Sequence, residues 1–432
     1  MRVLLIGAYG FIGSALAGEL ILRGHEVTGL GRDCAYGQRI LPKLTWVAID
    51  LAQMTTPESW NALLEGHDTV INASGLLQDG DGGSVQAVQF EAVRGLVAAC
   101  EAAGIKRFVQ ISAAGARMEA SSHFMSTKAR ADAVVGASAI PSLILRPGLV
   151  IGRNSYGGTE LVRNVAAVPI APRLPFSKSI QCIALSDVVE AVIRNIERDD
   201  MRTGSFDLVE RRGRSLGEII AVHRQWLGLP KAQWSMEVPG WLLKIVGSAA
   251  DLLGIFGWRS PLRTNALNAL DAGVVGDPTQ ARDLLQQEPL SLEETLAQQP
   301  AGKQDRLHAR LGLVQPLIIA TLFIMWGASG VATLLQLDRA AAIMTNSGVD
   351  KDLAYAIAIG GGWLDIILAA GLLWRRTIRP ILLTMIVITI VVYLIGGTIL
   401  VPDLWVDPLA PFAKALPATL LALITFWMVE KR

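Results

Sequence analysis

The chain has 432 residues, of which 51% are hydrophobic, and its mean hydropathy of +0.41 is too high for a purely soluble protein. This length predicts two or three domains. With 39 basic and 38 acidic residues, the formal net charge of +1 excludes a bulk attraction to nucleic acid, so no nucleic-acid partner is expected. Cys34, Cys100 and Cys182 lie far apart in the sequence, which indicates no disulfide framework and no metal site.

The first thirteen residues predict a nucleotide-binding turn. Residues 3–6 form an apolar run typical of a strand buried on both faces, and residues 14–23 have the apolar spacing of a helix. Gly7, Gly10 and Gly13 stand between them. The first would allow a sharp turn, the second the approach of a diphosphate to the backbone, and the third close packing of helix and sheet. The N–H groups and the positive end of the helix dipole would then face the phosphates.

The second expected strand, residues 25–30, bears on the choice of cofactor. An acidic residue at the end of this strand would bind the ribose 2′-hydroxyl of NAD. The chain instead has Gly31 followed by Arg32, whose guanidinium could pair with a 2′-phosphate, so the sequence favours NADP(H). Asp33, one place later, keeps NAD(H) open, and Arg32 could also be an ordinary solvated loop charge.

Further cofactor contacts are predicted after the next expected strands, residues 46–49 and 68–71. An acidic residue after the first of these can hydrogen-bond the adenine amino group, and small residues after the second let the cofactor lie across the strand ends. The predicted contacts, with those between the glycines, are Tyr9, Phe11, Ile12, Asp50, Leu51, Ala73, Ser74 and Gly75. The Tyr9 ring could equally serve packing alone. Residues 78–84 are expected to form a loop and residues 85–103 a helix.

Together these motifs resemble the extended or atypical short-chain dehydrogenase/reductase family, near the branch of the complex I 39-kDa subunit. The resemblance covers about the first 300 residues. The matching stretches are Gly7-x-x-Gly10-x-x-Gly13, Asp50-Leu51, residues 70–75, 104–112 and 145–152, and Ser186-Asp187-Val188. The resemblance implies an α/β fold, with a Rossmann doubly wound parallel sheet in residues 1–150 and a small substrate lobe in residues 151–300.

The family's catalytic set is only partly present. Catalytic members use a Tyr-x-x-x-Lys pair with a Ser or Thr, in which the lysine lowers the pKa of the tyrosine and holds the nicotinamide ribose. Lys128 matches the lysine and is also a predicted cofactor contact, but Phe124 stands at the tyrosine position and Ala114 at that of the third hydroxyl. Cofactor binding can survive this loss, whereas proton transfer needs a substitute. We predict Lys128, His123 and Ser112 as catalytic candidates, although His123 could be a plain loop histidine.

Residues 237–256 are apolar but are interrupted by Lys244 and Asp251. At this length they predict an amphipathic or interfacial helix rather than a membrane span. Three nearby tryptophans could contact a bilayer surface or a lipid-like substrate, or could belong to an ordinary core. They are Trp234, Trp241 and Trp258.

Four long apolar runs predict an all-α transmembrane domain of four helices in residues 301–432. Each run is near the ~20 residues needed to cross a bilayer, where the backbone must be helical. The runs are residues 311–337, 353–374, 381–401 and 409–429. The basic residues Arg306, Arg310, Arg375, Arg376, Arg379, Lys431 and Arg432 flank one side of these runs, and Asp338, Asp350, Asp352, Asp403 and Asp407 the other. This asymmetry predicts a multi-pass protein of the inner (cytoplasmic) membrane with both termini in the cytoplasm.

About the last 120 residues resemble the DoxX-like membrane family, over residues 362–368 and 404–417. The resemblance implies a link to quinone-coupled redox chemistry. Asp365 lies inside the second predicted span, where the family more often has Glu. An ionisable group inside the membrane is costly and is by default a functional candidate. A hydrogen bond to a neighbouring helix would explain it equally well.

Two functions from different classes remain open, and so does the question of whether the chain is an enzyme. The first is a membrane-anchored oxidoreductase that prefers NADP(H) over NAD(H) and acts on a lipid-soluble small molecule, such as a quinone or isoprenoid, in the lipid bilayer. The second is a non-catalytic nucleotide-binding scaffold or assembly factor for a membrane protein partner. A transporter with a nucleotide sensor is weaker, because only Asp365 marks a pathway.

Overall fold

The computed structural model describes residues 1–76, 78–80, 83–120, 122–258, 260, 262–408 and 410–429. The chain forms two compact units, which are described separately below. The first contains residues 1–251 and 260–309, and the second contains residues 252–259 and the chain from residue 310 onward. Two residues of the predicted loop 78–84, at positions 81 and 82, lie outside the described residues.

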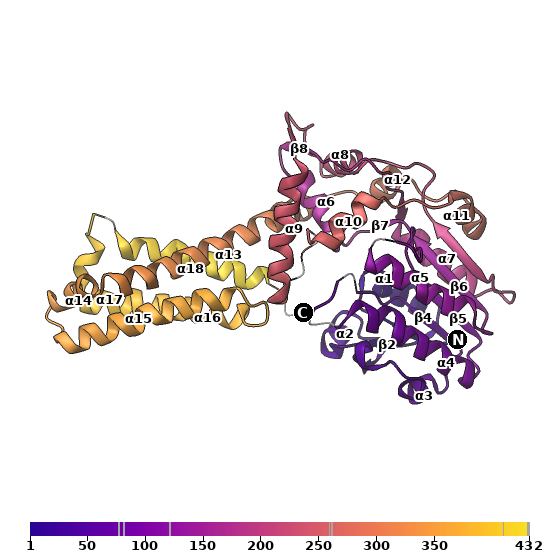
Figure 1. Ribbon diagram of the computed structural model, residues 1–432, viewed down its shortest axis with the longest axis horizontal. Coiled ribbons are helices and arrows are strands. Elements are labelled where there is room, and N and C mark those ends of the chain that lie inside the picture. Colours follow the sequence, from indigo (N-terminus) through magenta and orange to yellow (C-terminus); the bar gives the residue numbers. More distant parts are fainter. Residues whose placement is uncertain are drawn as a thin grey trace. The chain divides into compact units, whose positions relative to one another are not determined.

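The first unit is built on a seven-stranded parallel sheet with the order β10-β6-β5-β4-β1-β2-β3 (Figure 1). The strands are β1 Arg2–Ile6, β2 Glu26–Gly31, β3 Thr45–Ala48, β4 Thr69–Asn72, β5 Arg107–Ile111, β6 Ser142–Pro147 and β10 Gly204–Leu208. The strand order reverses between β1 and β4, and this switch point is where doubly wound sheets bind ligands. The predicted Rossmann fold is confirmed.

Helices cover both faces of this sheet. β1 is buried on both, because successive side chains of a strand point to opposite faces. Val3 and Leu5 belong to the apolar core with α1 (Phe11–Leu22) and α7 (Leu185–Ile196). Leu4 and Ile6 belong to the core with α4 (Ala92–Ala103) and α5 (His123–Gly136). The helical segments around the sheet are α1 Phe11–Leu22, α2 Cys34–Ile40, η1 Leu51–Gln53, η2 Pro57–Trp60, α3 Asn61–Leu64, the π-helical η3 Ala87–Glu91, α4 Ala92–Ala103, α5 His123–Gly136, α7 Leu185–Ile196 and α11 Pro278–Leu285.

A lobe of short strands and helices completes the first unit. Two small parallel pairs join β7 Leu149–Ile151 to β9 Cys182–Ala184, and β8 Ile170–Arg173 to β11 Trp234–Glu237. The helices are α6 Gly158–Ala166, α8 Leu216–Trp226, α9 Gly240–Ile255, α10 Thr264–Ala272 and α12 Leu292–Ala297. Capping boxes begin two of them, with Ser215 and Glu218 at α8 and Ser291 and Glu294 at α12.

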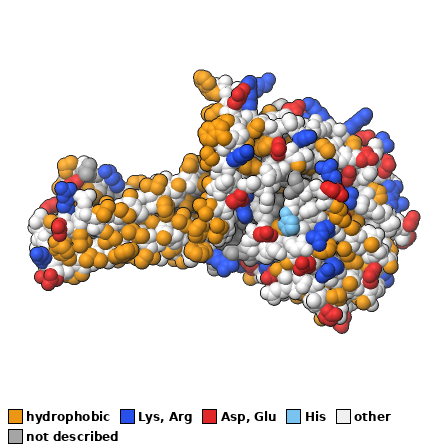
Figure 2. Space-filling model, in the orientation of Figure 1, with side chains coloured by type: hydrophobic (Ala, Val, Ile, Leu, Met, Phe, Trp, Pro, Cys, Tyr) orange, Lys and Arg blue, Asp and Glu red, His pale blue; other side chains and the backbone are white. Residues whose placement is uncertain are grey.

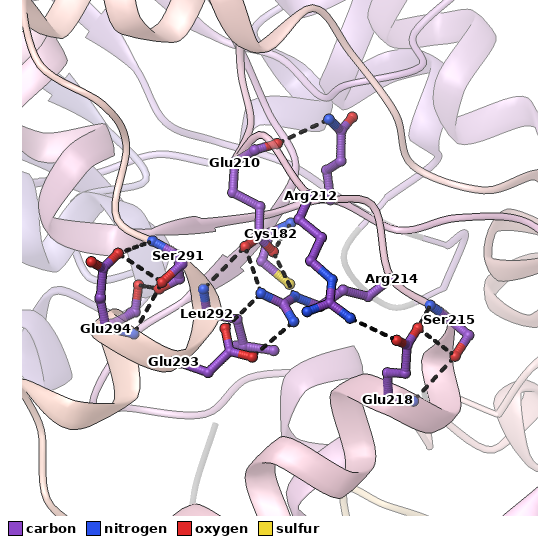
Figure 3. Close-up of polar contacts among 12 residues, drawn as sticks. Cys182, Glu210, Arg212, Arg214, Ser215, Glu218, Ser291, Leu292, Glu293 and Glu294 are labelled. Carbon is purple, nitrogen blue, oxygen red and sulfur yellow. Dashed lines mark hydrogen bonds and ion pairs between the residues drawn. The ribbon is translucent and has the colours of Figure 1, made fainter.

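A buried ion-pair network holds this lobe together (Figure 3). The Glu210 carboxylate accepts hydrogen bonds of 3.1 Å from the backbone N–H groups of Cys182 and Leu292, and it pairs with Arg214 at 3.2 Å. Arg214 also holds Glu293, at 2.6 and 2.9 Å. Burial and the Glu210 carboxylate raise the pKa of the Cys182 thiol. The network joins β9 to α12 with its charges paired, and it keeps the thiol protonated, so it serves structure.

The four candidate membrane spans are Lys303–Leu335, Lys351–Leu372, Ile378–Leu400 and Pro411–Met428, and all of them lie in the second unit except the first residues of the first span, up to residue 309. Figure 2 shows hydrophobic side chains covering the visible face of these helices. Outward apolar side chains are what a bilayer requires, and the predicted four helices are confirmed. The segments are α13 Lys303–Leu335, α14 Leu337–Thr345, α15 Lys351–Leu372, α16 Ile378–Ile388, the π-helical η4 Thr389–Gly396, α17 Gly397–Leu400, η5 Pro402–Trp405 and α18 Pro411–Met428.

Candidate functional site

The glycine turn has the close geometry that its sequence predicts. Gly7 adopts the left-handed conformation, with φ of +76°. A Cβ on Gly13 would lie 2.1 Å from the carbonyl oxygen of Gly7, so no larger residue fits there without moving the turn. The N–H of Gly10 donates a 2.9 Å hydrogen bond to the same oxygen. The turn therefore carries α1 directly over the end of β1.

The N-terminus of α1 is open to an anion. The N-cap, Gly10, offers no side-chain acceptor, and the first turn of α1 contains no acidic residue. The N–H groups of Phe11, Ile12 and Gly13 lie in this first turn, where a helix provides no acceptor of its own. The Phe11 ring lies near Gly152, where a Cβ would be 3.2 Å from it, and Ile12 packs on the core. Phe11 and Ile12 thus offer backbone donors for a diphosphate.

Tyr9 packs at the end of β2. Its hydroxyl accepts hydrogen bonds from the backbone N–H groups of Arg32 at 3.0 Å and Asp33 at 3.3 Å. Its ring covers Gly31, where a Cβ would lie 2.3 Å from the Tyr9 Cε1 atom. Tyr36 and Trp46 each lie 5.8 Å from it, centroid to centroid. Tyr9 therefore shapes the position at which a dinucleotide's adenosine ribose is recognised in this fold.

Arg32 and Asp33 are both exposed, but their side chains are used differently. The Asp33 carboxylate accepts a 2.8 Å hydrogen bond from the N–H of Tyr36 and is the N-cap of α2. The Arg32 guanidinium makes no hydrogen bond or ion pair within the described residues, so it is available to a ligand. The acidic side chain is thus committed to a helix end, whereas the basic one is not.

The residues that follow β3 and β4 lie around the switch point. Asp50 is exposed and caps the short segment η1, accepting the N–H of Ala52 at 3.1 Å. Leu51 lies close to Asn72 and Ser74. The Asn72 amide oxygen accepts the N–H and the hydroxyl of Ser74, at 3.1 and 2.5 Å, and so fixes the turn after β4.

Two further residues of that turn approach other parts of the site. The carbonyl oxygen of Ala73 would lie 3.0 Å from a Cβ on Gly7, so Ala73 packs its backbone directly against the glycine turn. A Cβ on Gly75 would lie 3.7 Å from Lys128 Nζ, which is ordinary van der Waals contact. The small residues therefore let the turn after β4 lie close to both the glycine turn and Lys128.

Lys128 is buried within α5 and reaches two neighbouring strand ends. Its ammonium donates to the carbonyl oxygen of Ile111 at 2.9 Å and to that of Ser74 at 3.2 Å. Burial lowers the pKa of this ammonium to about 8, against the raising effect of the Asp132 carboxylate. The pKa of Lys128 is therefore close to neutral pH, and such a shift is typical of functional lysines.

Ser112 is engaged in a buried cluster that the sequence did not reveal. Its hydroxyl donates a 2.9 Å hydrogen bond to Asp132, and Arg146 donates to the same carboxylate oxygen, also at 2.9 Å. The other oxygen, Asp132 Oδ1, is buried without a hydrogen-bond partner in the described part of the chain. Burial raises the pKa of Asp132. The i, i+4 spacing of Lys128 and Asp132 on one helix face was the available signal.

The remaining catalytic candidate, His123, lies at the start of α5. His123 is exposed at the first position of the helix, and Phe124 lies one turn before Lys128. Ala114 is buried and has no hydroxyl. No hydrogen bond among the described residues joins the His123 ring to Lys128, so the structure does not bring these two candidates together directly.

The second unit has a polar cluster of its own. Asp365, buried in α15, accepts hydrogen bonds from the Ser329 hydroxyl at 2.8 Å and from the Tyr393 hydroxyl at 2.9 and 3.1 Å. Trp326 packs edge-on against Tyr393, with ring centroids 6.2 Å apart. The three polar residues come from α13, α15 and the π-helical η4. Such π-helical turns often mark functional sites.

Comparisons with known proteins agree with this division. Residues 7–167 match the NAD(P)H-binding family model, and residues 323–424 match that of the DoxX-like family. The photosystem II assembly factor Ycf39 of Synechocystis sp. is 25% identical over 229 residues, which cover 53% of this chain and 68% of that protein. Ycf39 of Trieres chinensis is 23% identical over 263 residues, which cover 60% and 77% of the two chains.

Solved structures of low sequence identity share the fold. The Bordetella bronchiseptica enzyme WbmG in complex with NAD has a TM-score of 0.52 and 18% identity, covering 69% of this chain and 92% of WbmG. UDP-glucuronic acid 4-epimerase from Bacillus cereus, in complex with UDP-glucuronic acid and NAD, has a TM-score of 0.51 and 16% identity, covering 72% and 99%. The protein thus joins an NAD(P)-binding Rossmann domain to a DoxX-like domain with four candidate membrane helices, as both resemblances predicted.

Proposed function

We propose that this protein, an NAD(P)-binding Rossmann domain joined to a DoxX-like membrane domain, is an oxidoreductase that acts on a lipid-soluble substrate such as a quinone or isoprenoid. The observation that carries the proposal is the buried Lys128 ammonium beside the switch point, in a chain that also has four candidate spans. A nicotinamide cofactor, when bound, supplies or accepts a hydride. A lipid-soluble partner for that hydride explains why such a site is tied to a membrane domain.

Each predicted contact has a role in this proposal. The glycine turn leads into the first turn of α1, whose N–H groups at Phe11, Ile12 and Gly13 are offered to the diphosphate. When the cofactor is bound, Asp50 and Leu51 would hold the adenine, the turn from Ala73 to Gly75 would contact the nicotinamide half, and Lys128 would donate to the ribose hydroxyls. The lobe of residues 151–300 provides the substrate-facing wall. Small side chains and an open helix end are the features that fit this cofactor.

The proposed preference is for NADP(H). Its support is that Asp33 is committed to the N-cap of α2 while the Arg32 guanidinium is exposed. An arginine–phosphate contact is charge-assisted, and a hydrogen bond to a charged group is worth about 1.5–3 kcal/mol, roughly a tenfold or larger effect on affinity.

Nicotinamide fluorescence titration of the full chain in nanodiscs tests both claims. NADPH should bind more tightly than NADH, and Arg32→Gln should reduce that ratio about tenfold or more while leaving NADH affinity unchanged. Arg39→Gln, in α2, is a matched loss of one nearby charge and should leave the ratio intact. No binding of either nucleotide at millimolar concentration would overturn the function, whereas an unchanged ratio in Arg32→Gln would overturn only the preference.

Proton transfer is assigned to the residues that remain around Lys128. Phe124 has no hydroxyl, so it cannot transfer a proton as the tyrosine of the family does. Lys128, which loses its proton near pH 8, is our first candidate for the acid, followed by His123 and Ser112. Oxidation of NADPH by short-chain quinones should fall by at least a hundredfold in Lys128→Met, a typical size for general acid catalysis. His123→Ala is the test of the second candidate.

The alternative function is a non-catalytic nucleotide-binding assembly factor for a membrane complex. It is supported by Phe124 and Ala114 at the family's catalytic positions, and by the similarity to Ycf39. In this case the wild type oxidises no NADPH with any quinone or aldehyde, yet purifies with a stable membrane partner. The double variant Phe124→Tyr with Ala114→Ser restores both hydroxyls. NADPH oxidation that appears only in this variant would show that the chain has lost the family's reaction.

We also propose that the protein lies in the inner (cytoplasmic) membrane with both termini in the cytoplasm. Arg375, Arg376 and Arg379 follow the second candidate span, and Asp350 and Asp352 lie near its start, as the positive-inside rule requires. Lys431 and Arg432, which belong to the same argument, lie outside the described residues. Fusion of a cytoplasm-specific reporter to either terminus should give full activity. Activity at only one terminus would contradict an even number of spans.

A further inference from the structure

Helix α9 presents a stripe of large apolar side chains outward. Trp241, Ile245, Leu252 and Ile255 recur at helical spacing and are 63%, 58%, 59% and 75% exposed. The spacing places all four on one face of the helix. A soluble protein rarely leaves four large apolar side chains exposed on one face of a helix, so we expect a partner to cover this face.

The opposite face of α9 is fixed by packing within the protein. Gly247 and Ala250 are the buried residues of this helix. A Cβ on Gly247 would lie 3.0 Å from the Thr264 hydroxyl and 3.3 Å from a Leu267 methyl carbon, both on α10. The helix therefore packs on α10 through its small residues and cannot turn its large ones inward.

The C-terminal end of α9 is attached to the edge of a candidate span. The segment 252–259 belongs to the second unit. There the Phe256 carbonyl accepts the N–H of Arg375 at 3.0 Å, and the Trp258 indole N–H donates to the Leu373 carbonyl at 2.6 Å. Residues 373–375 directly follow α15, which ends at Leu372. The apolar stripe thus ends beside the end of a candidate span.

The strand before α9 continues the apolar surface. Trp234 and Met236 of β11 are exposed, and their spacing of two places both on one side of the strand. Tryptophans are favoured at the membrane–water interface, where the ring is at headgroup level. Lys244, an exposed residue of α9, can keep its ammonium in water while its methylenes lie along the apolar surface.

We propose that α9 is an interfacial helix that lies on the lipid bilayer, with Trp241, Ile245, Leu252 and Ile255 inserted at the boundary between headgroups and acyl chains. Trp234 and Met236 extend the same contact. Continuity with the second candidate span favours a bilayer over a second copy of the chain or another protein. This inference does not depend on the proposed reaction, because it concerns a surface outside the cofactor site and outside the four spans.

Spin labelling of the full chain in phosphatidylethanolamine–phosphatidylglycerol nanodiscs tests this assignment. A nitroxide is placed singly at Trp241→Cys, Ile245→Cys or Ile255→Cys, in a background where the partly exposed Cys34 is replaced by Ser. Collisions with dissolved oxygen report lipid, and collisions with a nickel chelate report water. Leu317→Cys, an exposed position of α13, serves as the lipid reference, and Leu22→Cys, at the exposed end of α1, as the water reference.

The labels on α9 should match Leu317→Cys, with oxygen accessibility several-fold above that of nickel. A match to Leu22→Cys would place the stripe in water and overturn the proposal. Low accessibility to both agents would place it against protein, a second copy or a partner, and would equally overturn it. Three separate positions keep the test decisive if one variant fails to assemble, and NADPH titration of each labelled protein reports whether the cofactor site has been disturbed.

Discussion

The ammonium of Lys128 lies 2.9 Å from the carbonyl oxygen of Ile111, the last residue of β5. A second bond, to Ser74, carries the same side chain to the segment after β4. One buried charge therefore bridges the adjacent ends of β4 and β5, beside the switch point. Because burial lowers its pKa to about 8, this charge is retained in neutral solution and lost in mild alkali.

We expect NADPH to bind less tightly as the pH rises through about 8, because Lys128 then loses the charge that holds the ribose hydroxyls. The sign follows from a folded pKa below the usual 10.5, so deprotonation begins at lower pH than for an exposed lysine. The loss should reach about tenfold in affinity. A pH series of NADPH titrations measures it. Lys128→Arg stays charged and should remove the decline, whereas the same decline in both proteins would contradict the role.

The glycine turn predicts opposite effects for two substitutions in one helix. Gly13→Ala places a Cβ 2.1 Å from the Gly7 carbonyl oxygen, so the turn must open, and both NADPH binding and stability should be lost. Gly18→Ala, also in α1, meets nothing within 4 Å and should raise the free energy of unfolding by about 0.5–1 kcal/mol. Denaturant unfolding measures the stability of the two variants, and nucleotide titration measures their affinity for NADPH. Equal behaviour would show that the turn tolerates a side chain.

The hydroxyl of Ser112 should matter for stability more than for cofactor binding. Ser112→Ala removes one donor from the buried Asp132, whose other oxygen already lacks a partner in the described structure, and should cost about 1–3 kcal/mol of unfolding free energy. NADPH affinity should be nearly unchanged. Ser126→Ala is the control, because among the described residues the Ser126 hydroxyl donates to the His123 carbonyl of its own helix turn, and it should change stability by less than about 0.5 kcal/mol. Lost turnover at unchanged stability would instead make Ser112 a catalytic residue.

The features that sequence predicted were those encoded locally. The glycine turn needs only a strand, three glycines and a helix in succession, and the spans need only long apolar runs. The start of α13 was missed. The first apolar run was predicted to begin at residue 311, but the helix begins at Lys303, where the N–H of Gly302 donates to the Asp305 carboxylate at 2.7 Å. A hydropathy pattern detects the apolar part of a long helix and not its polar first turns.

The contacts that sequence missed join residues far apart in the chain. The Tyr9 hydroxyl meets the N–H groups of Arg32 and Asp33 only because β1 and β2 are neighbours in the sheet. Asp132 and Arg146 pair because α5 packs over β6. Neither residue type nor spacing specifies such a pair in advance. In the same way, Asp365 read as a candidate for function or for an interhelical bond, and its two donors come from two other helical segments.

Removal of the Tyr393 hydroxyl tests how much the cluster of Asp365, Ser329 and Tyr393 contributes to the stability of the second unit. In the described structure, Tyr393→Phe leaves the buried Asp365 with Ser329 as its remaining donor. The second unit should lose about 1 kcal/mol of stability, since hydrogen bonds between membrane helices are worth about 0.6–2 kcal/mol. Tyr355→Phe is a matched change, because its hydroxyl donates to Asp338 at 2.7 Å on the exposed surface, and it should cost less. Unfolding in nanodiscs, followed by tryptophan fluorescence, compares the two variants. If Tyr393→Phe is as stable as the wild type but loses quinone-dependent NADPH oxidation, the cluster contributes to the reaction rather than to the fold.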